Sequence, residues 1–138
     1  DQGRRRARDQ TGSSAYALAT ALHIRYDHVW QGESTSCVMP AVTRLTAPED
    51  VSVAARIADG IGVWKDGMTA QAAADATADA LDALYRRIGM PARIRDIDIP
   101  KADLPLLAKD TLKNFNANPG DRPGDYTERM LRLLEAAW

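Results

Sequence analysis

Two histidines and an aspartate lie close together in the first third of the chain and could do chemistry. His23 and His28 flank Asp27, and Gly32 follows, so the cluster invites interpretation as a metal site. A structural zinc site takes about four protein ligands and a catalytic site about three, so this pair needs help from Glu33 or from another chain. We therefore favour exposed loop histidines over a metal site.

Other residues that often act as nucleophiles have no supporting pattern. Cys37, the only cysteine, has no histidine at helical spacing, which favours a small core residue over a nucleophile. Ser13 and Ser14 lack the preceding strand of a nucleophile elbow, and the glycines between 60 and 67 lack the strand, turn and helix order of a phosphate-binding loop. The chain alone carries no complete set of residues for a standard catalytic chemistry.

The composition excludes several classes of partner. The chain has 138 residues, is 45% hydrophobic and has a net charge of -1, which fits one domain and offers no overall field for nucleic acid or an anionic membrane. The basic run from Arg86 to Arg95 is interpreted as a solvated helix end rather than a site for an acidic partner. No apolar run approaches the roughly 20 residues of a membrane span, and one cysteine favours a reduced, cytoplasmic setting.

Helices must position these residues, because no segment alternates like a half-buried strand. Thr69 is a candidate cap for the longest helix, which should end at Gly89. We expect a loop from His23 to Gly32, an extended connector over 91–99 and a loop over 116–124. The expected helices span 5–22, 33–45, 51–60, 70–88, 104–115 and 126–138. Phe115 is expected on the apolar face of the fifth.

Three stretches resemble consecutive parts of one known family. Residues 17–42, ALATALHIRYDHVWQGESTSCVMPAV, look like its segment H-x-x-x-H-x-L-G … P-H-G … L-L-P-H-V. Residues 87–112, RIGMPARIRDIDIPKADLPLLAKDTL, look like its helix end G-x-P-x-x-L-R-D, acidic pair and leucine helix. Residues 116–138, NANPGDRPGDYTERMLRLLEAAW, are similar to its closing loop and its final helix ending in Ala-Trp. The chain thus resembles the C-terminal helical domain of the iron-containing alcohol dehydrogenase family, in the branch that contains maleylacetate reductases.

The resemblance implies an all-α helical bundle, the C-terminal half of a dehydroquinate synthase-like fold, with residues 1–138 as one domain. In that family a divalent metal is held by an aspartate and three histidines, and a separate N-terminal domain binds the nicotinamide cofactor. The family's histidines fall here on Tyr16, Thr20 and Gln31, and His28 could partly replace Gln31 in space. Neutral side chains cannot hold a divalent ion comparably, so the resemblance implies a polar cleft without a bound metal.

Three hypotheses follow, and all need a partner because the nucleotide-binding domain is not part of this sequence. In the first, the chain is a separately encoded or cleaved part of a dehydrogenase-like protein, with NAD(P) bound through an N-terminal-type chain or domain and a small carbonyl or alcohol substrate between them. In the second, the same cleft performs a non-redox elimination or cyclisation, with Tyr16 or His28 as acid or base. In the third, the chain is a noncatalytic subunit that stabilises its partner.

Overall fold

The computed structural model describes the backbone of residues 2–115, 117 and 123–138, and their side chains from residue 11 onward. All regular elements in this described part are helical, and it contains no strand. The α-helices are α1 (Gln2–Arg25), α2 (Gln31–Thr46), α3 (Val51–Ile61), α4 (Ala70–Ile88), α5 (Leu104–Asp110) and α6 (Pro123–Ala137). Short 3-10 helices are η1 (Ala47–Glu49), η2 (Ile94–Ile97), η3 (Lys101–Asp103) and η4 (Thr111–Lys113). The predicted all-α fold is confirmed.

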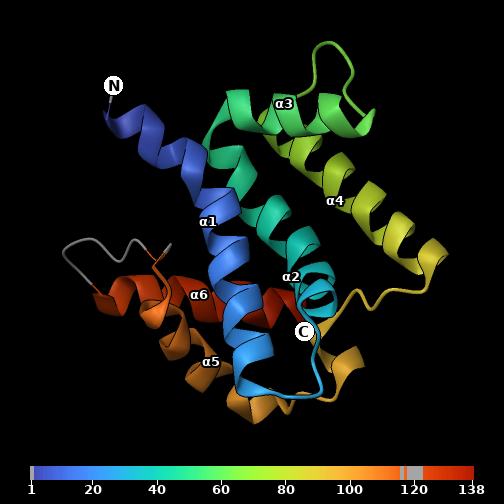
Figure 1. The fold of residues 1–138 in the computed structure, drawn as a ribbon. Helices are drawn as coiled ribbons and strands as arrows, with labels where there is room; N and C mark the ends of the chain where they lie inside the picture. The colour runs from blue at the N-terminus through green and yellow to red at the C-terminus, as the bar shows by residue number, and fades with distance from the viewer. Residues whose placement is uncertain (1, 116, 118–122) are drawn as a thin grey trace.

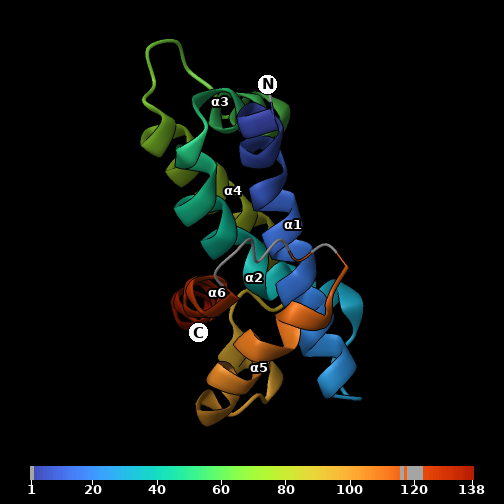
Figure 2. The same ribbon diagram turned by 90° about the vertical axis from the view of Figure 1, so that its left-hand side faces the viewer.

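Helices α1, α2 and α4 run side by side with α2 in the middle, and α6 crosses α1 and α2 (Figure 1). Figure 2 shows α6 almost end-on beside the long axes of the other three helices. The main core lies where α1, α2, α5 and α6 meet, and Leu18, Val38, Leu107 and Leu134 are fully buried there. A second, smaller core of alanines joins α3 to α4, because small side chains let the two backbones approach closely.

The helix ends follow capping rules that can be read from sequence. The Asp50 carboxylate accepts hydrogen bonds from the first backbone amides of α3. The Thr69 hydroxyl oxygen accepts a hydrogen bond from the backbone amide of Ala72 in α4, at an N to Oγ1 distance of 3.0 Å. Gly62 and Gly89 end these helices with φ angles of 84° and 76°, in the left-handed region that glycine adopts without strain. The predicted Thr69 cap and Gly89 stop are confirmed.

Two predicted boundaries were wrong. His23 is not in a loop: α1 continues to Arg25, because no proline or glycine follows Leu22 within it, and the His23 ring lies 3.1 Å from the Ala19 carbonyl oxygen. The connector over 91–99 is not fully extended, because it turns through η2. That turn buries both Ile94 and Ile97, since residues three apart in a 3-10 helix lie on one face.

The prediction for the fifth helix was also wrong at its end. Its α-helical part stops at Asp110, and η4 continues only to Lys113. Asn114 then takes an extended conformation with ψ 134°, which ends the helix and carries Phe115 away from the apolar face. Phe115 is 86% exposed instead of buried. Most of the predicted loop over 116–124 lies outside the described residues, and α6 begins inside that range at Pro123.

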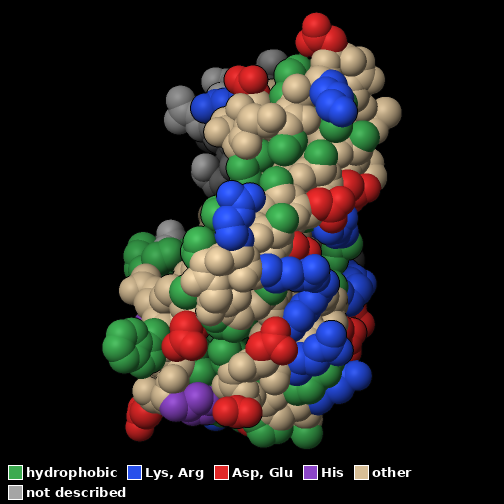
Figure 3. Space-filling view, turned by 90° about the vertical axis from the view of Figure 1, so that its right-hand side faces the viewer, with side chains coloured by type: hydrophobic (Ala, Val, Ile, Leu, Met, Phe, Trp, Pro, Cys, Tyr) green, Lys and Arg blue, Asp and Glu red, His purple; other side chains and the backbone are tan. Residues whose placement is uncertain are grey.

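The surface of the described part is mixed in charge. Lys and Arg side chains gather on the lower half of the face in Figure 3, with acidic groups among them. Of the basic run predicted as a solvated helix end, Arg86, Arg87 and Arg95 are exposed and Arg93 is half-buried. None of the described helices combines the length and the apolar character that crossing a bilayer would require.

Candidate active-site groove

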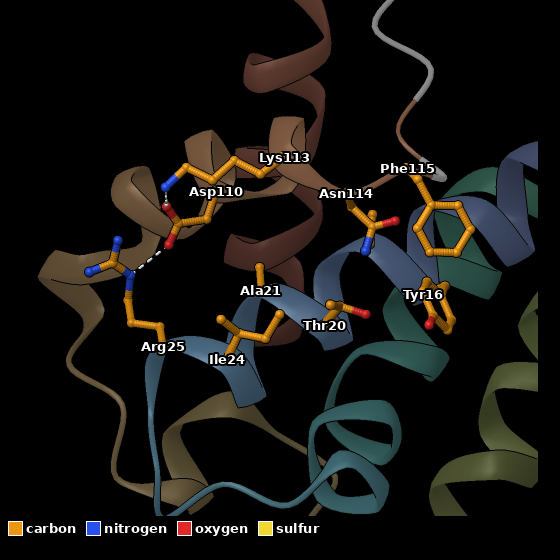
Figure 4. Close-up of a pocket in the computed structure, with 10 residues that line it drawn as sticks. Tyr16, Thr20, Ala21, Ile24, Arg25, Asp110, Lys113, Asn114 and Phe115 are labelled. Atoms are coloured by element: carbon orange, nitrogen blue, oxygen red, sulfur yellow. Dashed lines mark hydrogen bonds and ion pairs between the residues drawn. The ribbon is translucent and has the colours of Figure 1, made fainter.

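A groove of about 510 Å³ runs between the second half of α1 and the segment that ends α5. Figure 4 shows its walls: Tyr16, Thr20 and Ile24 lie along α1, and Asp110 and Phe115 lie on the opposite segment. Residues four apart project from the same face of a helix, so α1 presents its three side chains as a row. Between them lie Ala17 and Ala21, whose small side chains leave room above the helix.

The Tyr16 and Phe115 rings form an aromatic end of the groove. Their centroids are 6.1 Å apart at an interplanar angle of 63°, an edge-to-face arrangement that aromatic rings favour. Both rings are exposed, so this end presents unusually large apolar surfaces to solvent. Ile24 is also exposed but lies beside Arg25, at the other end of the row on α1 (Figure 4). Such surfaces are typical of binding sites rather than of bare protein surface.

The opposite end of the groove is charged. Arg25 Nε donates to Asp110 Oδ2 at 2.6 Å, and Lys113 Nζ lies 3.4 Å from Asp110 Oδ1. The hydrogen bond from Arg25 holds the pKa of the Asp110 carboxyl below its ordinary value, although partial burial acts in the opposite direction. Asp110 is therefore ionised at neutral pH and is engaged by both cations. The groove thus runs from an aromatic end to a charged end, with Thr20 and Asn114 between them (Figure 4).

The structure brings together only two of the four predicted site residues. Tyr16 and Thr20 both line the groove, whereas His28 and Gln31 are not among its lining residues. The His28 ring packs edge-on against Tyr26, with centroids 5.8 Å apart, and its Nε2 lies 2.9 Å from the Ile97 carbonyl oxygen. Gln31 is exposed at the first position of α2. A catalytic role for His28 or Gln31 stays a prediction.

Sequence reasoning missed Arg25, Asp110, Lys113 and Asn114 as groove residues. Arg25 and Asp110 are 85 positions apart, and no motif links them. The sequence points to these two residues only through their positions, because Arg25 is the last residue of α1 and Asp110 is the last residue of α5. Phe115 was placed in the core, although it forms the aromatic end of the groove.

Cys37 is a small core residue, as predicted. It is buried, and its thiol donates a hydrogen bond to the Arg93 carbonyl oxygen at 3.2 Å. Burial raises the pKa of this thiol to about 12, and the negative charges of Asp96 and Glu33 act in the same direction. A thiol of this kind is a poor nucleophile.

The described residues contain no group of three or more histidine, cysteine or acidic side chains that could hold a metal ion. At the groove itself the polar atoms come from the hydroxyls of Tyr16 and Thr20, the Asn114 amide, and the charged end. The single carboxylate there, Asp110, is paired with Arg25 and Lys113.

Comparison with known proteins places this fold in a family. The sequence pattern of the C-terminal domain of the Fe-containing alcohol dehydrogenase family matches residues 10–138. The chain is 32% identical over 108 residues to lactaldehyde reductase of Escherichia coli K12, and 31% identical over 113 residues to 1,3-propanediol dehydrogenase of Citrobacter freundii. These matches cover 78% and 82% of this chain but only 28% and 29% of the relatives.

Solved structures agree with this assignment. An alcohol dehydrogenase from Oenococcus oeni superposes with a TM-score of 0.77 at 25% identity, over 90% of this chain and 32% of that one. A 1,3-propanediol oxidoreductase gives a TM-score of 0.76 at 26% identity, over 91% of this chain and 32% of that one. The chain belongs to the iron-containing alcohol dehydrogenase family and corresponds to its C-terminal domain.

Proposed function

We propose that this chain forms one wall of the active cleft of an alcohol dehydrogenase-like oxidoreductase that acts on a small carbonyl or alcohol compound without a metal bound through this chain. The other wall is an N-terminal nucleotide-binding-type domain or chain that holds NAD(P). The two curated relatives named above support the reaction class, because their names describe a reductase and a dehydrogenase. This chain spans less than a third of their length, so a complete enzyme of this kind needs a second domain.

The observation that carries the proposal is the groove at Tyr16 and Thr20. The family resemblance puts two of the family's histidines at these positions, and the structure independently has both side chains lining one hollow. Helical spacing sets their Cβ atoms about 5–6 Å apart, so both hydroxyls can reach one bound molecule. Large apolar side chains are exposed around these two polar groups, which is typical of a binding surface.

The groove does not fit the divalent metal that the family implies. Iron and zinc sites use imidazole, thiolate or carboxylate ligands, whereas Tyr16, Thr20 and Asn114 offer neutral hydroxyls and an amide. The Asp110 carboxylate is the one suitable ligand lining the groove, and its two oxygens are within reach of Arg25 and Lys113. We therefore assign no step to a metal.

In the proposed reduction, the substrate carbonyl lies over α1 between the aromatic and charged ends. NAD(P)H, when bound by the N-terminal-type domain, would supply the hydride. The Tyr16 hydroxyl donates its proton to the carbonyl oxygen as the hydride reaches the carbon, giving the alcohol, and solvent then returns a proton to the tyrosine. Thr20 and Asn114 offer hydrogen bonds that orient the same oxygen.

Several finer points remain predictions. They are the maleylacetate reductase branch, a cytoplasmic setting, and the separation of the two halves into different chains. A contribution of His28 or Gln31 to the cleft also remains a prediction, because both are exposed and a partner domain could bring substrate to them.

The test is the substitution Tyr16→Phe, which removes the hydroxyl and keeps the ring against Phe115. In the complete protein, kcat for nicotinamide-dependent carbonyl reduction should fall about 100-fold with KM little changed, because the lost group acts in the proton transfer. Tyr85→Phe, on α4 and away from the groove, is the matched control and should leave kcat unchanged. Unchanged kcat in Tyr16→Phe would favour a noncatalytic stabilising role, and turnover without nicotinamide would favour elimination or cyclisation.

A further inference from the structure

The charged end of the groove carries more positive than negative charge. Among the lining residues, Arg25 and Lys113 both lie beside the single Asp110 carboxylate, so the lining has one more cation than anion, and Asp103 acts on Arg25 from outside the lining. Arg25 uses its Nε for Asp110, and no described residue accepts a hydrogen bond from its two Nη atoms. The Lys113 side chain is 81% exposed. Two donors therefore remain available for an anion at this end.

The opposite end of the groove offers apolar contact. Phe115 is 86% exposed and Tyr16 is 43% exposed, and their rings contact each other edge to face. Aromatic rings stack against flat or aliphatic groups. Such binding is favourable because it removes the apolar surfaces of both partners from water. The volume of about 510 Å³ lies in the range of small-molecule sites, which runs from about 300 to 1,000 Å³.

We propose that the groove binds a substrate with an apolar or aromatic body and a carboxylate, the body against Tyr16 and Phe115 and the carboxylate at Arg25 and Lys113. This inference rests on the proposed function and names the substrate class of the same cleft. The two ends of the groove lie on opposite sides of Thr20 and Asn114, so a molecule that spans the groove passes its middle across both polar groups (Figure 4). A carbonyl between the ring and the carboxylate would then lie where the proposed chemistry occurs.

A protein surface is the competing occupant, because the partner domain could cover the groove. An apolar protein surface would match Ile24 and Phe115 but would bury the excess charge at Arg25 and Lys113 without an anion. Burial of an unpaired charge is costly, whereas a ligand carboxylate would neutralise it. Charge complementarity therefore favours the acid over an apolar protein surface.

Equilibrium binding of a matched pair of probes tests the proposal. 3-Phenylpropanoate and 3-phenylpropanamide have nearly the same shape, but only the first is charged. In the complete protein the acid should bind about threefold to tenfold more tightly than the amide, as expected for a cation pair at a partly exposed site. Added salt should reduce this preference, because it screens the charge contribution.

Two substitutions at the charged end should move the preference in opposite directions. Lys113→Gln removes one of the two cations, so the preference for the acid over the amide should shrink. Asp110→Asn removes the competing anion, so the preference should grow by about threefold. Lys109→Gln is the matched control: Lys109 is also exposed, but it lines a different hollow between α5 and α6, and its loss should change nothing.

Each outcome of the binding experiment tests the inferred substrate class and is independent of the proposed reaction. Acid and amide binding equally, or a preference that is unchanged in Lys113→Gln, would overturn it. Binding of neither probe would also overturn it. Thermal unfolding of each variant separates lost binding from lost folding, and Lys113→Gln is expected to fold normally because its side chain is exposed. The proposed oxidoreduction is judged separately, by turnover in Tyr16→Phe.

Discussion

Arg25 and Asp110 join the end of α1 to the end of α5 by a hydrogen-bonded ion pair with an Nε to Oδ2 distance of 2.6 Å. The pair fixes the two walls of the groove relative to each other, although the residues are 85 positions apart. Arg25 ends the row of side chains on α1, and Asp110 precedes the short turn that carries Asn114 and Phe115. The pair therefore adds a polar contact to the apolar packing that already joins α1 and α5 in the main core.

This contact predicts a specific dependence of stability on pH. The pKa of Asp110 is lower in the folded chain than its ordinary value, so the contribution of Asp110 to stability is complete above the unfolded-state pKa. That contribution is lost as the pH falls below the unfolded-state pKa of about 4 and on through the lower folded-state pKa. Urea unfolding of the native chain and of Asp110→Asn should differ most at neutral pH and converge at low pH. A constant difference across this window would contradict the assignment.

Leu107 and Leu106 provide a matched pair on α5. Leu107 is fully buried in the main core, whereas its neighbour Leu106 is 43% exposed. Leu107→Ala should reduce the free energy of unfolding by about 2–5 kcal/mol because it leaves a cavity, and it should loosen the helix that carries Asp110. Leu106→Ala should cost less than about 1 kcal/mol. Chemical denaturation measures both, and equal losses would show that α5 does not pack as described.

Cys37 should be inert in the folded chain. With the pKa of its thiol raised to about 12 by burial, roughly one molecule in ten thousand would carry a thiolate at pH 8. A thiol reagent such as dithionitrobenzoate should label the native protein very slowly and the urea-unfolded protein at once. Rapid labelling of the native protein would mean that the α2 environment of Cys37 is open or that the residue is activated.

Short-range sequence signals, such as helix caps and glycine stops, were sufficient to predict most of the helices. Thr69 and Gly89 bound α4 as predicted, because capping and left-handed turns depend on residues within one helical turn. The end of α5 was not predictable in this way. An apolar residue at helical spacing, Phe115, was expected in the core, but the chain leaves the helix at Asn114 and exposes the ring.

The groove was only half predictable. Tyr16 and Thr20 share one helix, so the family resemblance and their spacing were enough to bring them together. Arg25 and Asp110 meet through tertiary packing, which no local pattern reports. His28 and Gln31 were grouped with the first pair, yet the structure turns His28 towards Ile97 and leaves Gln31 exposed at the start of α2. Contacts between helices therefore decide the composition of the site.

Metal content measured together with activity tests the central claim most directly. The complete protein should be assayed for nicotinamide-dependent carbonyl reduction before and after exhaustive treatment with a strong chelator, with iron and zinc quantified in the same samples. Metal-free reduction predicts an unchanged rate and far less than one metal ion per chain, because Tyr16, Thr20 and Asn114 offer neutral donors. Stoichiometric iron or zinc, lost together with activity and restored by adding the metal back, would contradict it.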